Sequence, residues 1–342
     1  MLDGIDPHSV LPLAVDWSSL TSGLFLTNVG VLAGIYALLA LGLQLNVGFT
    51  GITNFGQAGF MAVGAYTMAI LVVKAELPLW AACLAALAAA IGFGLLLGLP
   101  TLRLRADYLA ITTIAFAEII RYVAINEQRL TGGPVGTIAL AGPGRAASYN
   151  SDWLELQRTV QGWLEALIGD AATRDVTMLV IVWTVALILL VLVDAALRSP
   201  WGRVLRAIRE DEDAASALGK NVFAYKLQSL AVGAVLAAVA GLFFAFQFSF
   251  FSPGDFDPLV TFFAYTIVIL GGAARNWALP VGALLFGLIF AGTRFFDFPP
   301  FTFFDSAERA YLRLIVIGLI LIGLMLFRPQ GLFGKREEMV LE

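Results

Sequence analysis

Charged residues are scarce in this sequence. Asp, Glu, Lys and Arg make up 13% of the 342 residues, whereas hydrophobic residues make up 59%. Soluble domains carry about 25% charged and about 45–50% apolar residues, so the composition excludes an ordinary soluble fold. The chain is therefore an integral membrane protein. Its net charge of −4 says little, because the distribution of Lys and Arg across the loops matters more than their sum.

Histidine and cysteine are nearly absent, with one residue each, His8 and Cys83. A disulfide within the chain is therefore impossible, and we predict no metal site, because His and Cys ligands are lacking. The phosphate-cradling pattern GxxxxGK[ST] is also missing, since Gly219-Lys220 and Gly334-Lys335 lack the upstream glycine and the following Ser or Thr. The chain has no hydrolase signature and no basic, aromatic-rich patch typical of nucleic-acid binding. These absences argue against an enzyme and against nucleic acid as a partner.

Long apolar runs dominate what is present. A window of about 19 residues finds about nine of them. They are Leu24–Leu45, Phe55–Val73, Leu79–Leu99, Tyr108–Ile125, Met178–Leu197, Leu227–Gln247, Val260–Gly272, Ala278–Phe295 and Leu312–Phe327. We expect an all-α polytopic membrane protein with about nine transmembrane helices, between about eight and ten, in a single domain over residues 24–342. The seventh run is short for a hydrocarbon core of about 30 Å and is expected to be broken or tilted.

Basic residues set the expected orientation, because short loops rich in Lys and Arg stay in the cytoplasm. With the N-terminus outside, the inner segments collect most of the Lys and Arg residues over much shorter loops. The segment 1–23 carries three Asp and no Lys or Arg, so it lacks the basic start of a cleavable signal and suits the outer side. We therefore expect an external N-terminus, an external loop over 126–176, and a cytoplasmic tail over 328–342.

One charged island, Ser199 to Lys226, lies between two apolar runs and reads SPWGRVLRAIREDEDAASALGKNVFAYK. Because a charged side chain at the bilayer centre costs roughly 2.5 to 3.5 kcal/mol on insertion scales, this segment must face water. Pro200 and Gly219 bracket a run of good helix formers, which predicts one short surface helix that ends at a glycine C-cap. A folded cytoplasmic helix of this kind is suited to contact with a partner protein.

Polar residues also gather where the first and second runs meet, interleaved with glycines. The candidates for a pathway or for the bundle interior are Gln44, Asn46, Asn54 and Gln57. Such a run is tolerated at membrane depth only when it is buried in protein or faces a water-filled cavity. Two interpretations stay open: a helix break that lines a route through the membrane, or a tight inner loop capped by Asn.

Glu118 and Arg121 are the charged candidates inside a predicted span. Their spacing of three residues places them on one helix face, where they can neutralise one another. They form either a structural ion pair or subunit contact, or a contact with a transported solute. In the external loop, Trp153, Val160, Trp163 and Leu167 recur at helical spacing, which predicts a helix. This helix either lies on the membrane or packs on the spans, or it forms a docking platform for an extracellular or periplasmic partner.

Several segments together resemble a known family. Asp213 to Gly219 reads DAASALG, which is similar to the EAA loop of ABC importer permeases, with Asp in place of Glu. Other stretches resemble the LivM-type permeases of branched-chain amino-acid ABC importers, in family order from the first span to the tail. They are LNVGFTGITNFGQAGFMAVGAYT (45–67), LRLRADYLAITTIAFAEIIR (102–121), LTGGPVG (130–136), WGRVLRAIREDEDAASALGKN (201–221) and RPQGLFG (328–334). The IxLP that follows the glycine in maltose-type permeases is absent, in agreement with the LivM-like branch.

The resemblance implies a permease in the bacterial cytoplasmic (inner) membrane with no ATPase site or cofactor of its own; ATP and Mg belong to the partners. Those partners are a LivH-type permease in a heterodimer, two cytoplasmic ATPase subunits, and a periplasmic or lipid-anchored substrate-binding protein. The expected coupling residues are Arg203, Arg206, Glu210, Asp213, Ala214, Ala215 and Gly219. The alternatives are the permease of a urea ABC importer, a secondary transporter that works without an ATPase, and a membrane enzyme.

Overall fold

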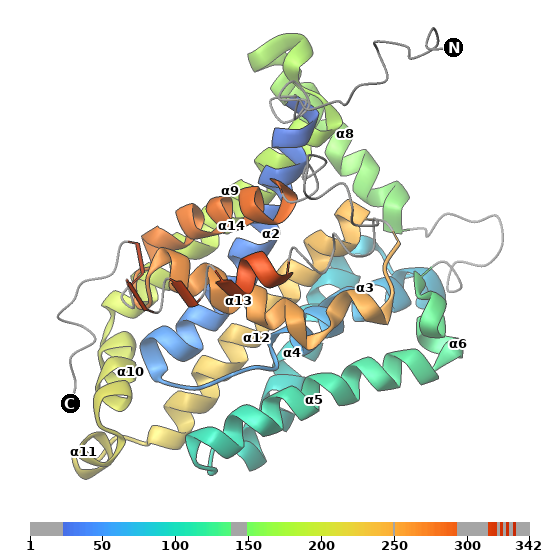
Figure 1. Ribbon diagram of the computed structural model, residues 1–342. Helices are drawn as coiled ribbons and strands as arrows, with labels where there is room; N and C mark the ends of the chain where they lie inside the picture. Colours follow the sequence, from blue (N-terminus) through green and yellow to red (C-terminus); the bar gives the residue numbers. More distant parts are fainter. Residues whose placement is uncertain are drawn as a thin grey trace, which may run out of the picture.

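The computed structural model describes residues 23–137, 149–248 and 250–292, and the short stretches 314–319, 322–323, 326–327 and 331–332. Regular structure in these residues is entirely helical, with no strand (Figure 1). Residues 1–22 of the predicted external segment, most of the ninth predicted span and nearly all of the tail 328–342 lie outside the described residues. The helical class of the chain is confirmed.

Six helical segments are long and apolar enough to cross a membrane, and they match the first six predicted spans. They are Gly23–Phe49 (α2, Gly23–Leu43, with η1, Gln44–Phe49), Gln57–Ala75 (α3), Leu79–Thr101 (α4), Asp107–Asn126 (in α5, Ala106–Asn126), Arg174–Arg198 (α9) and Val222–Phe248 (α12). This count, within the described part of the chain, rests on length and composition.

The seventh and eighth predicted spans form one bent unit. α13 (Pro258–Gly271) and α14 (Leu279–Gly292) have 14 residues each and meet at an angle of 105° around η5 (Asn276–Ala278). A helix of 14 residues is roughly 21 Å long, shorter than a hydrocarbon core of about 30 Å. The pair adds at most one crossing to the six, so the total of nine and the orientation of the termini stay predictions.

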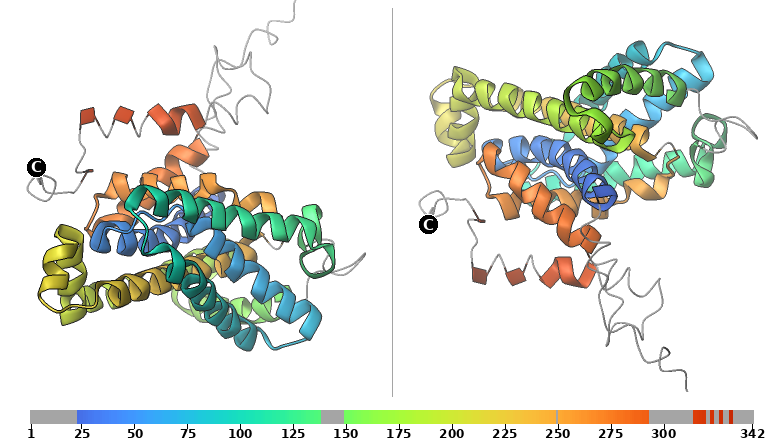
Figure 2. Two further views of the ribbon diagram at one scale, coloured as in Figure 1. Left: turned by 90° about the horizontal axis from the view of Figure 1, so that it is seen from below. Right: turned by 90° about the horizontal axis from the view of Figure 1, so that it is seen from above.

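α12 runs through the centre of the bundle and packs on α2, α3 and α4 (Figures 1 and 2). Small residues allow these close approaches: a Cβ on Gly64 of α3 would lie 2.5 Å from the carbonyl oxygen of Ala238 in α12. Cβ atoms on Gly94 and Gly98 of α4 would lie 3.3 Å from the Ala234 side chain and 2.5 Å from the Leu227 side chain of α12, so these glycines also allow close approach. In lipid, helices associate through such close packing, because acyl chains already surround apolar side chains.

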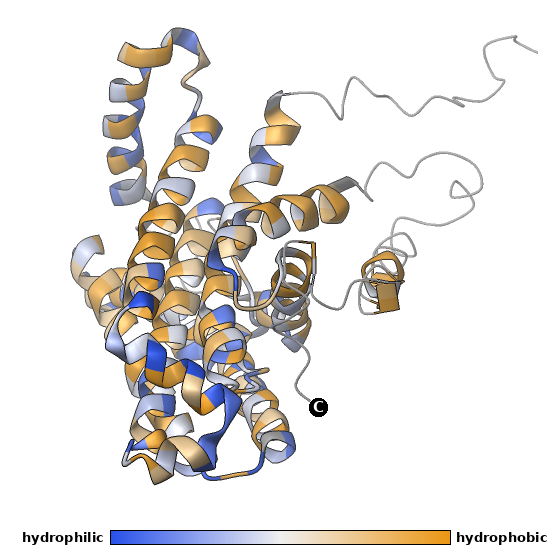
Figure 3. Ribbon diagram, turned by 90° about the vertical axis from the view of Figure 1, so that its left-hand side faces the viewer, coloured by the Kyte–Doolittle hydropathy of each residue, from blue (hydrophilic) through white to orange (hydrophobic). Residues whose placement is uncertain are grey.

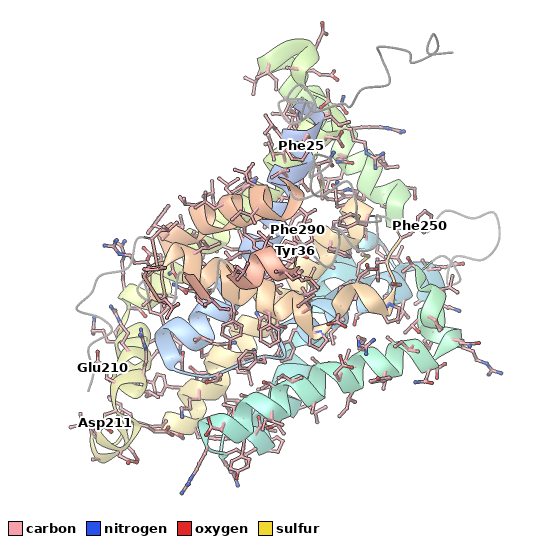
Figure 4. The ribbon with its side chains drawn as sticks, in the orientation of Figure 1. Phe25, Tyr36, Glu210, Asp211, Phe250 and Phe290 are labelled. Carbon is pink, nitrogen blue, oxygen red and sulfur yellow. The ribbon has the colours of Figure 1, made fainter. Side chains whose placement is uncertain are left out.

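Aromatic side chains fix the bent unit to α2. Tyr36 of α2 meets Phe263 of α13 and Phe286 of α14 edge to face, with ring centroids 6.2 and 5.7 Å apart. Phe286 stacks in turn on Phe290, at 5.6 Å. Figure 4 labels Tyr36 and Phe290 in the middle of the molecule. These contacts hold α13 and α14 against the bundle although neither helix is long enough to span alone.

The predicted amphipathic helix of the external loop is confirmed as α8, Tyr149–Ile168. It is followed by η3, Gly169–Ala171, and with the adjoining end of α9 it forms a hairpin that extends beyond the bundle (Figure 3). Trp153 is buried and stacks on Phe246 of α12, with ring centroids 4.2 Å apart. Trp163 and Leu167 stay exposed, at 68% and 80%. One end of α8 is thus anchored to the core. Residues 138–148 of the loop are not described; before them come α6 (Gln128–Thr131) and η2 (Gly133–Val135).

Candidate functional site

The chain leaves α-helical geometry between α2 and α3. α2 passes into the π-helix η1, which ends next to Thr50. Residues 51–56 have no regular structure, and α3 begins at Gln57. The break lies beside α5, because the Phe55 amide donates to Thr113 Oγ1 at 2.9 Å. Thr113 is seven residues into α5, roughly 10 Å along its axis. Irregular backbone at membrane depth needs protein partners for its polar groups, and π-helical turns are frequent at functional sites.

Gln57 and Asn54 join the break to the core. Asn54 Nδ2 donates to Gln57 Oε1 at 2.9 Å, and Gln57 Nε2 donates to the carbonyl oxygen of Gly233 in α12 at 3.0 Å. Asn54 Oδ1 accepts from the Gly56 amide at 2.9 Å. Both amide side chains are fully buried. A Cβ on Gly42 would lie 2.6 Å from the Gly233 oxygen, so this site depends on a missing side chain.

A second set of polar contacts connects η1 with α12. Thr50 Oγ1 and Ser229 Oγ are 2.7 Å apart, and Ser229 Oγ lies 3.3 Å from Asn46 Oδ1. All three side chains are buried. Asn46 Nδ2 has no hydrogen-bond partner among the residues that the structure describes. Because a buried amide without a partner costs about 1–3 kcal/mol, Asn46 is the one strained member of this set in the described chain.

Gln44 holds the turn of the bent unit. With its amide oxygen turned toward them, it accepts from the backbone N–H groups of Ala274 and Arg275, at 2.9 and 2.8 Å. Ala274 has a φ of +63°, an unusual conformation for a residue with a side chain. The buried Gln44 side chain thus supports a strained turn 230 residues away in sequence from Ala274.

The four predicted polar residues therefore meet protein on every side in this conformation, since Gln44, Asn46, Asn54 and Gln57 are all 0% exposed. They connect η1 and the break with α12 and with the α13–α14 turn. The helix break of the first interpretation and the Asn54 cap of the second are both present, and a route lined by the break stays a prediction.

Glu118 and Arg121 form a bidentate ion pair, with distances of 2.9 Å from Nε to Oε1 and 2.7 Å from Nη2 to Oε2. Their side chains keep 26% and 18% of their surface exposed, and Arg121 lies over the ring of Tyr122. The pair is roughly 7 to 12 Å beyond Thr113 along α5, so the structure does not bring it into the buried polar set.

The charged island contains two helices rather than the predicted one. α10 runs from Pro200 to Glu210 and α11 from Glu212 to Ala217. Asp211 between them is extended, with φ −154° and ψ 108°, and its Oδ1 caps α11 by accepting from the Ala214 amide at 2.9 Å. The single-helix prediction is wrong because an Asp in this position stabilises a new helix start better than a continued helix. Figure 4 labels Glu210 and Asp211 at this corner.

A small apolar cluster holds the two helices on the bundle. Ile208, Ala215 and Val222 are buried against one another, and Lys226 forms an ion pair with Glu212. Ala214 and Leu218 stay exposed, Leu218 at 80%. Of the two neighbouring alanines among the predicted coupling residues, Ala214 thus faces outward and Ala215 faces the bundle.

The other predicted coupling residues lie mostly on the open side of α10 and α11. Arg203, Arg206, Glu210, Asp213 and Gly219 are all exposed. Gly219 has a φ of +76°, and the next amide, of Lys220, returns to the Ala215 carbonyl at 3.2 Å, as in a glycine-type helix end. The C-cap prediction is confirmed. Figure 3 shows the hydrophilic residues gathered at this end of the bundle.

Two residues outside the predicted set connect the parts. Arg209 Nη1 of α10 donates to the Gly48 carbonyl of η1, and its backbone lies 3.5 Å from where a Cβ of Gly51 would be. Ser229 is the hydroxyl that bonds Thr50. Ser229 had a signal, a lone hydroxyl inside an apolar run, whereas Arg209 looked like any other base of the island.

Comparison with known proteins places residues 25–325 in the family described as branched-chain amino acid transport system, permease component. The chain is 34% identical over 334 residues to the high-affinity branched-chain amino acid transport system permease protein LivM of Escherichia coli K12, covering 95% of this chain and 73% of that protein. Identity to the LivM protein of Salmonella typhimurium LT2 is 32%, again over 95% of this chain and 73% of the relative.

A more distant relative is the LivH protein of the same Escherichia coli strain, at 24% identity over 91% of this chain and 94% of that protein. No solved structure matches the chain. The resemblance found in the sequence segments is confirmed.

Proposed function

Because this chain belongs to the LivM-type permeases of the branched-chain amino acid transport permease family, we propose that it is the membrane subunit of an ABC importer. It moves branched-chain or related neutral amino acids inward by alternating access, driven by ATP hydrolysis on partner subunits. ATP and Mg bind those subunits and no cofactor binds this chain. The chain lies in the bacterial inner membrane with its N-terminus outside and its C-terminus in the cytoplasm.

The bond from Arg209 to Gly48 is the observation that carries the mechanism. It joins α10, whose far side is exposed, to η1, whose Gln44 supports the α13–α14 turn. A displacement of α10 by an ATPase subunit would therefore reach both the helix break and the bent unit. Coupling needs such a two-state element, because a partner that contacts both states equally shifts no equilibrium.

The ATPase contact in this proposal is the open side of α10 and α11. Leu218, which follows the last residue of α11, is the large apolar side chain exposed there, and Arg203, Glu210 and Asp213 supply charges that set the register. Ala215 contributes by holding α11 on the bundle rather than by touching the partner. Each of the two permeases would occupy one of two ATPase subunits.

The pathway is assigned to the polar break and to the face of α5 that carries Glu118 and Arg121. A charged pair that keeps about a fifth of its surface exposed within a span is unsuited to lipid, which favours a second permease of the LivH type, or the aqueous route between the two, on that face. Opening would expose Gln44, Asn46, Asn54 and Gln57, which are sealed in the present conformation. A substrate-binding protein would deliver the solute from the external side.

The test compares two exposed leucines at opposite ends of the molecule, both 80% exposed. We expect Leu218→Glu to lose co-purification of the ATPase subunits and ATP-driven leucine uptake in proteoliposomes. The control Leu167→Glu on α8 should keep the ATPase subunits. Retention of the ATPase by Leu218→Glu would refute the assigned contact.

The same proteoliposomes separate the alternatives. Leucine uptake by the lone chain without an ATPase would identify a secondary transporter instead. ATP-driven uptake of urea in place of leucine would identify the urea importer.

A further inference from the structure

A cavity lies on the side of the molecule that carries α10, apart from the polar break. It is formed by the last turns of α9, by α10, by the end of η1 and by the α13–α14 turn. The polar and amphipathic residues that line it are Asp194, Arg198, Arg206, Arg275, Asn276 and Trp277. Arg206 is also a predicted coupling residue and Arg275 belongs to the turn that Gln44 supports, but none of the contacts described above fills the cavity.

The charge of the lining is positive. Three guanidinium groups face one carboxylate, that of Asp194, which pairs with Arg198 at 2.7 Å. The Arg198 side chain is nevertheless 75% exposed. Arg206 donates from Nη2 to the Leu197 carbonyl at 2.9 Å and from Nε to the Gly202 carbonyl at 3.4 Å, which leaves Nη1 as its further donor group toward the cavity. Guanidinium donors of this kind recognise phosphate oxygens with good geometry.

Asn276 indicates a ligand independently of the arginines. It is only 3% exposed and lines the cavity, yet neither its amide nitrogen nor its amide oxygen has a hydrogen-bond partner in the described parts of the chain. Buried amides in native proteins are hydrogen-bonded as a rule, and an exception requires an explanation. Both amide atoms are closed to solvent in this conformation. A turn of the side chain toward the cavity would let a ligand oxygen satisfy the amide nitrogen and a ligand hydroxyl satisfy the amide oxygen.

The outer wall of the cavity is apolar. Trp277 is 56% exposed and Val281, one turn into α14, is 39% exposed. Tryptophan is typical of the level where lipid headgroups meet acyl chains, and basic pockets between membrane helices bind anionic headgroups.

From these observations we propose that the cavity binds the phosphate group of an anionic glycerophospholipid. Arg198, Arg206 and Asn276 bind the headgroup, and the acyl chains leave along Trp277 and Val281. That this lipid lies in the cytoplasmic leaflet rests on the orientation given under the proposed function. The recognition of a phosphate group does not depend on that orientation. A bound headgroup would bridge α10 and the α13–α14 turn, the two elements that η1 also joins.

The experiment uses the assembled importer in nanodiscs and measures thermal unfolding of this subunit and the phospholipid that it retains in native mass spectrometry. Wild type should unfold at a higher temperature in nanodiscs that contain phosphatidylglycerol than in pure phosphatidylcholine. Asn276→Leu and Arg198→Gln should each lower phosphatidylglycerol retention about fivefold or more. The control Arg105→Gln removes an exposed charge at the same end of the bundle and should change nothing.

A further arm adds inorganic phosphate to the detergent-solubilised complex without lipid. Protection by phosphate alone supports the site with a soluble anion as its occupant, and protection by phosphatidylglycerol alone supports it with the lipid. In phosphatidylcholine, Asn276→Leu should be at least as stable as wild type, because it removes a buried amide that has no protein partner.

Equal retention in wild type and Asn276→Leu would overturn the proposal, as would an equal loss in Arg105→Gln. Should Asn276→Leu fail to assemble, Arg198→Gln decides alone, since its side chain lies largely at the surface. None of these readouts depends on uptake, so a failure of the transport proposal would be seen separately.

Discussion

Around Gln57 the amide side chains of Gln44, Asn46 and Asn54 are closed off from solvent, whereas around Asp213 nearly every side chain is open to it. The polar break is held by hydrogen bonds to helix backbones and by glycines that leave no free volume. α11 is held by a small buried apolar cluster and one ion pair, while α10 also buries Leu205 in the main core and bonds to Gly48 through Arg209. The polar break is therefore the rigid region and the α10–α11 pair is the adaptable one. The hydrogen bond from Arg209 to Gly48 connects them. Substitutions in the two regions should differ in size and in kind.

The largest effect is expected for Gly64→Val in the bundle beneath the break. A Cβ there lies 2.5 Å from the Ala238 carbonyl oxygen, which belongs to helix backbone and cannot rotate away. The substitution should cost about 3 kcal/mol or prevent folding, seen as loss of the monodisperse peak in size-exclusion chromatography. The control Gly92→Val has no atom within 4 Å of its Cβ and should elute like wild type. A normal peak for Gly64→Val would mean that the core is far less tight than the structure shows.

Next in size is Gln57→Leu in the break itself. The Leu side chain has a similar volume but leaves the amide of Asn54 without its acceptor, at a cost of about 1–3 kcal/mol. The melting temperature of the purified subunit should fall. Gln161→Leu on α8, where the amide donates to the exposed Glu165, should leave it unchanged. If both variants melt alike, the buried hydrogen bonds do not stabilise the break.

Arg209→Ala tests the connection between the two regions. Loss of the bond to Gly48 should cost only about 1.5 kcal/mol, yet leucine uptake per ATP hydrolysed should fall about tenfold while the ATPase subunits remain bound. Arg209→Lys keeps an N–H donor and should restore part of the coupling. Arg105→Ala is the matched control, an exposed base at the same end. A parallel loss of ATPase binding and uptake in Arg209→Ala would place Arg209 at the ATPase contact instead.

The rigid region was easier to predict from the sequence than the adaptable one. Six apolar spans, α8 and the polar run between Gln44 and Gln57 follow from local hydropathy and spacing, which depend only on residues close in sequence. Gly219 after a run of helix formers predicted a helix end with a positive φ, as observed. These features depend on neighbours in sequence.

Features that depend on distant packing could not be predicted. The bond from Arg209 to Gly48 spans 161 residues and that from Thr50 to Ser229 spans 179, and neither has a periodic pattern. The charged island divides into two helices at Asp211 because the Asp211 side chain accepts from the Ala214 amide and so starts α11. The bent unit packs on α2 through aromatic contacts of Tyr36 with Phe263 and Phe286, which lie more than 220 residues away in sequence.

A smaller effect is expected for Gly219→Ala at the end of α11. A residue with a Cβ at φ +76° is strained by about 1 kcal/mol, although nothing lies within 4 Å. Gly169→Ala at the end of α8 has the same open space and a φ of +62°, so the melting temperature should fall by a similar amount in both variants. Only Gly219→Ala should weaken ATPase retention in pull-downs. Equal retention by the two would show that the partner tolerates a shifted end of α11.

The smallest effect is expected for Glu212→Gln, which removes the ion pair that ties α11 to α12. Glu212 is 53% exposed, so water screens its attraction to Lys226, and the pair should contribute about 0.5 kcal/mol or less. The melting temperature should barely change, and the small change should vanish in high salt, because salt screens exposed charges. Glu165→Gln on α8 removes an exposed carboxylate charge but keeps an oxygen that can accept from Gln161 Nε2, so it serves as the control. A fall as large as that of Gln57→Leu would show that one ion pair fixes the α10–α11 pair as firmly as buried hydrogen bonds fix the break, and the two regions would no longer differ in rigidity.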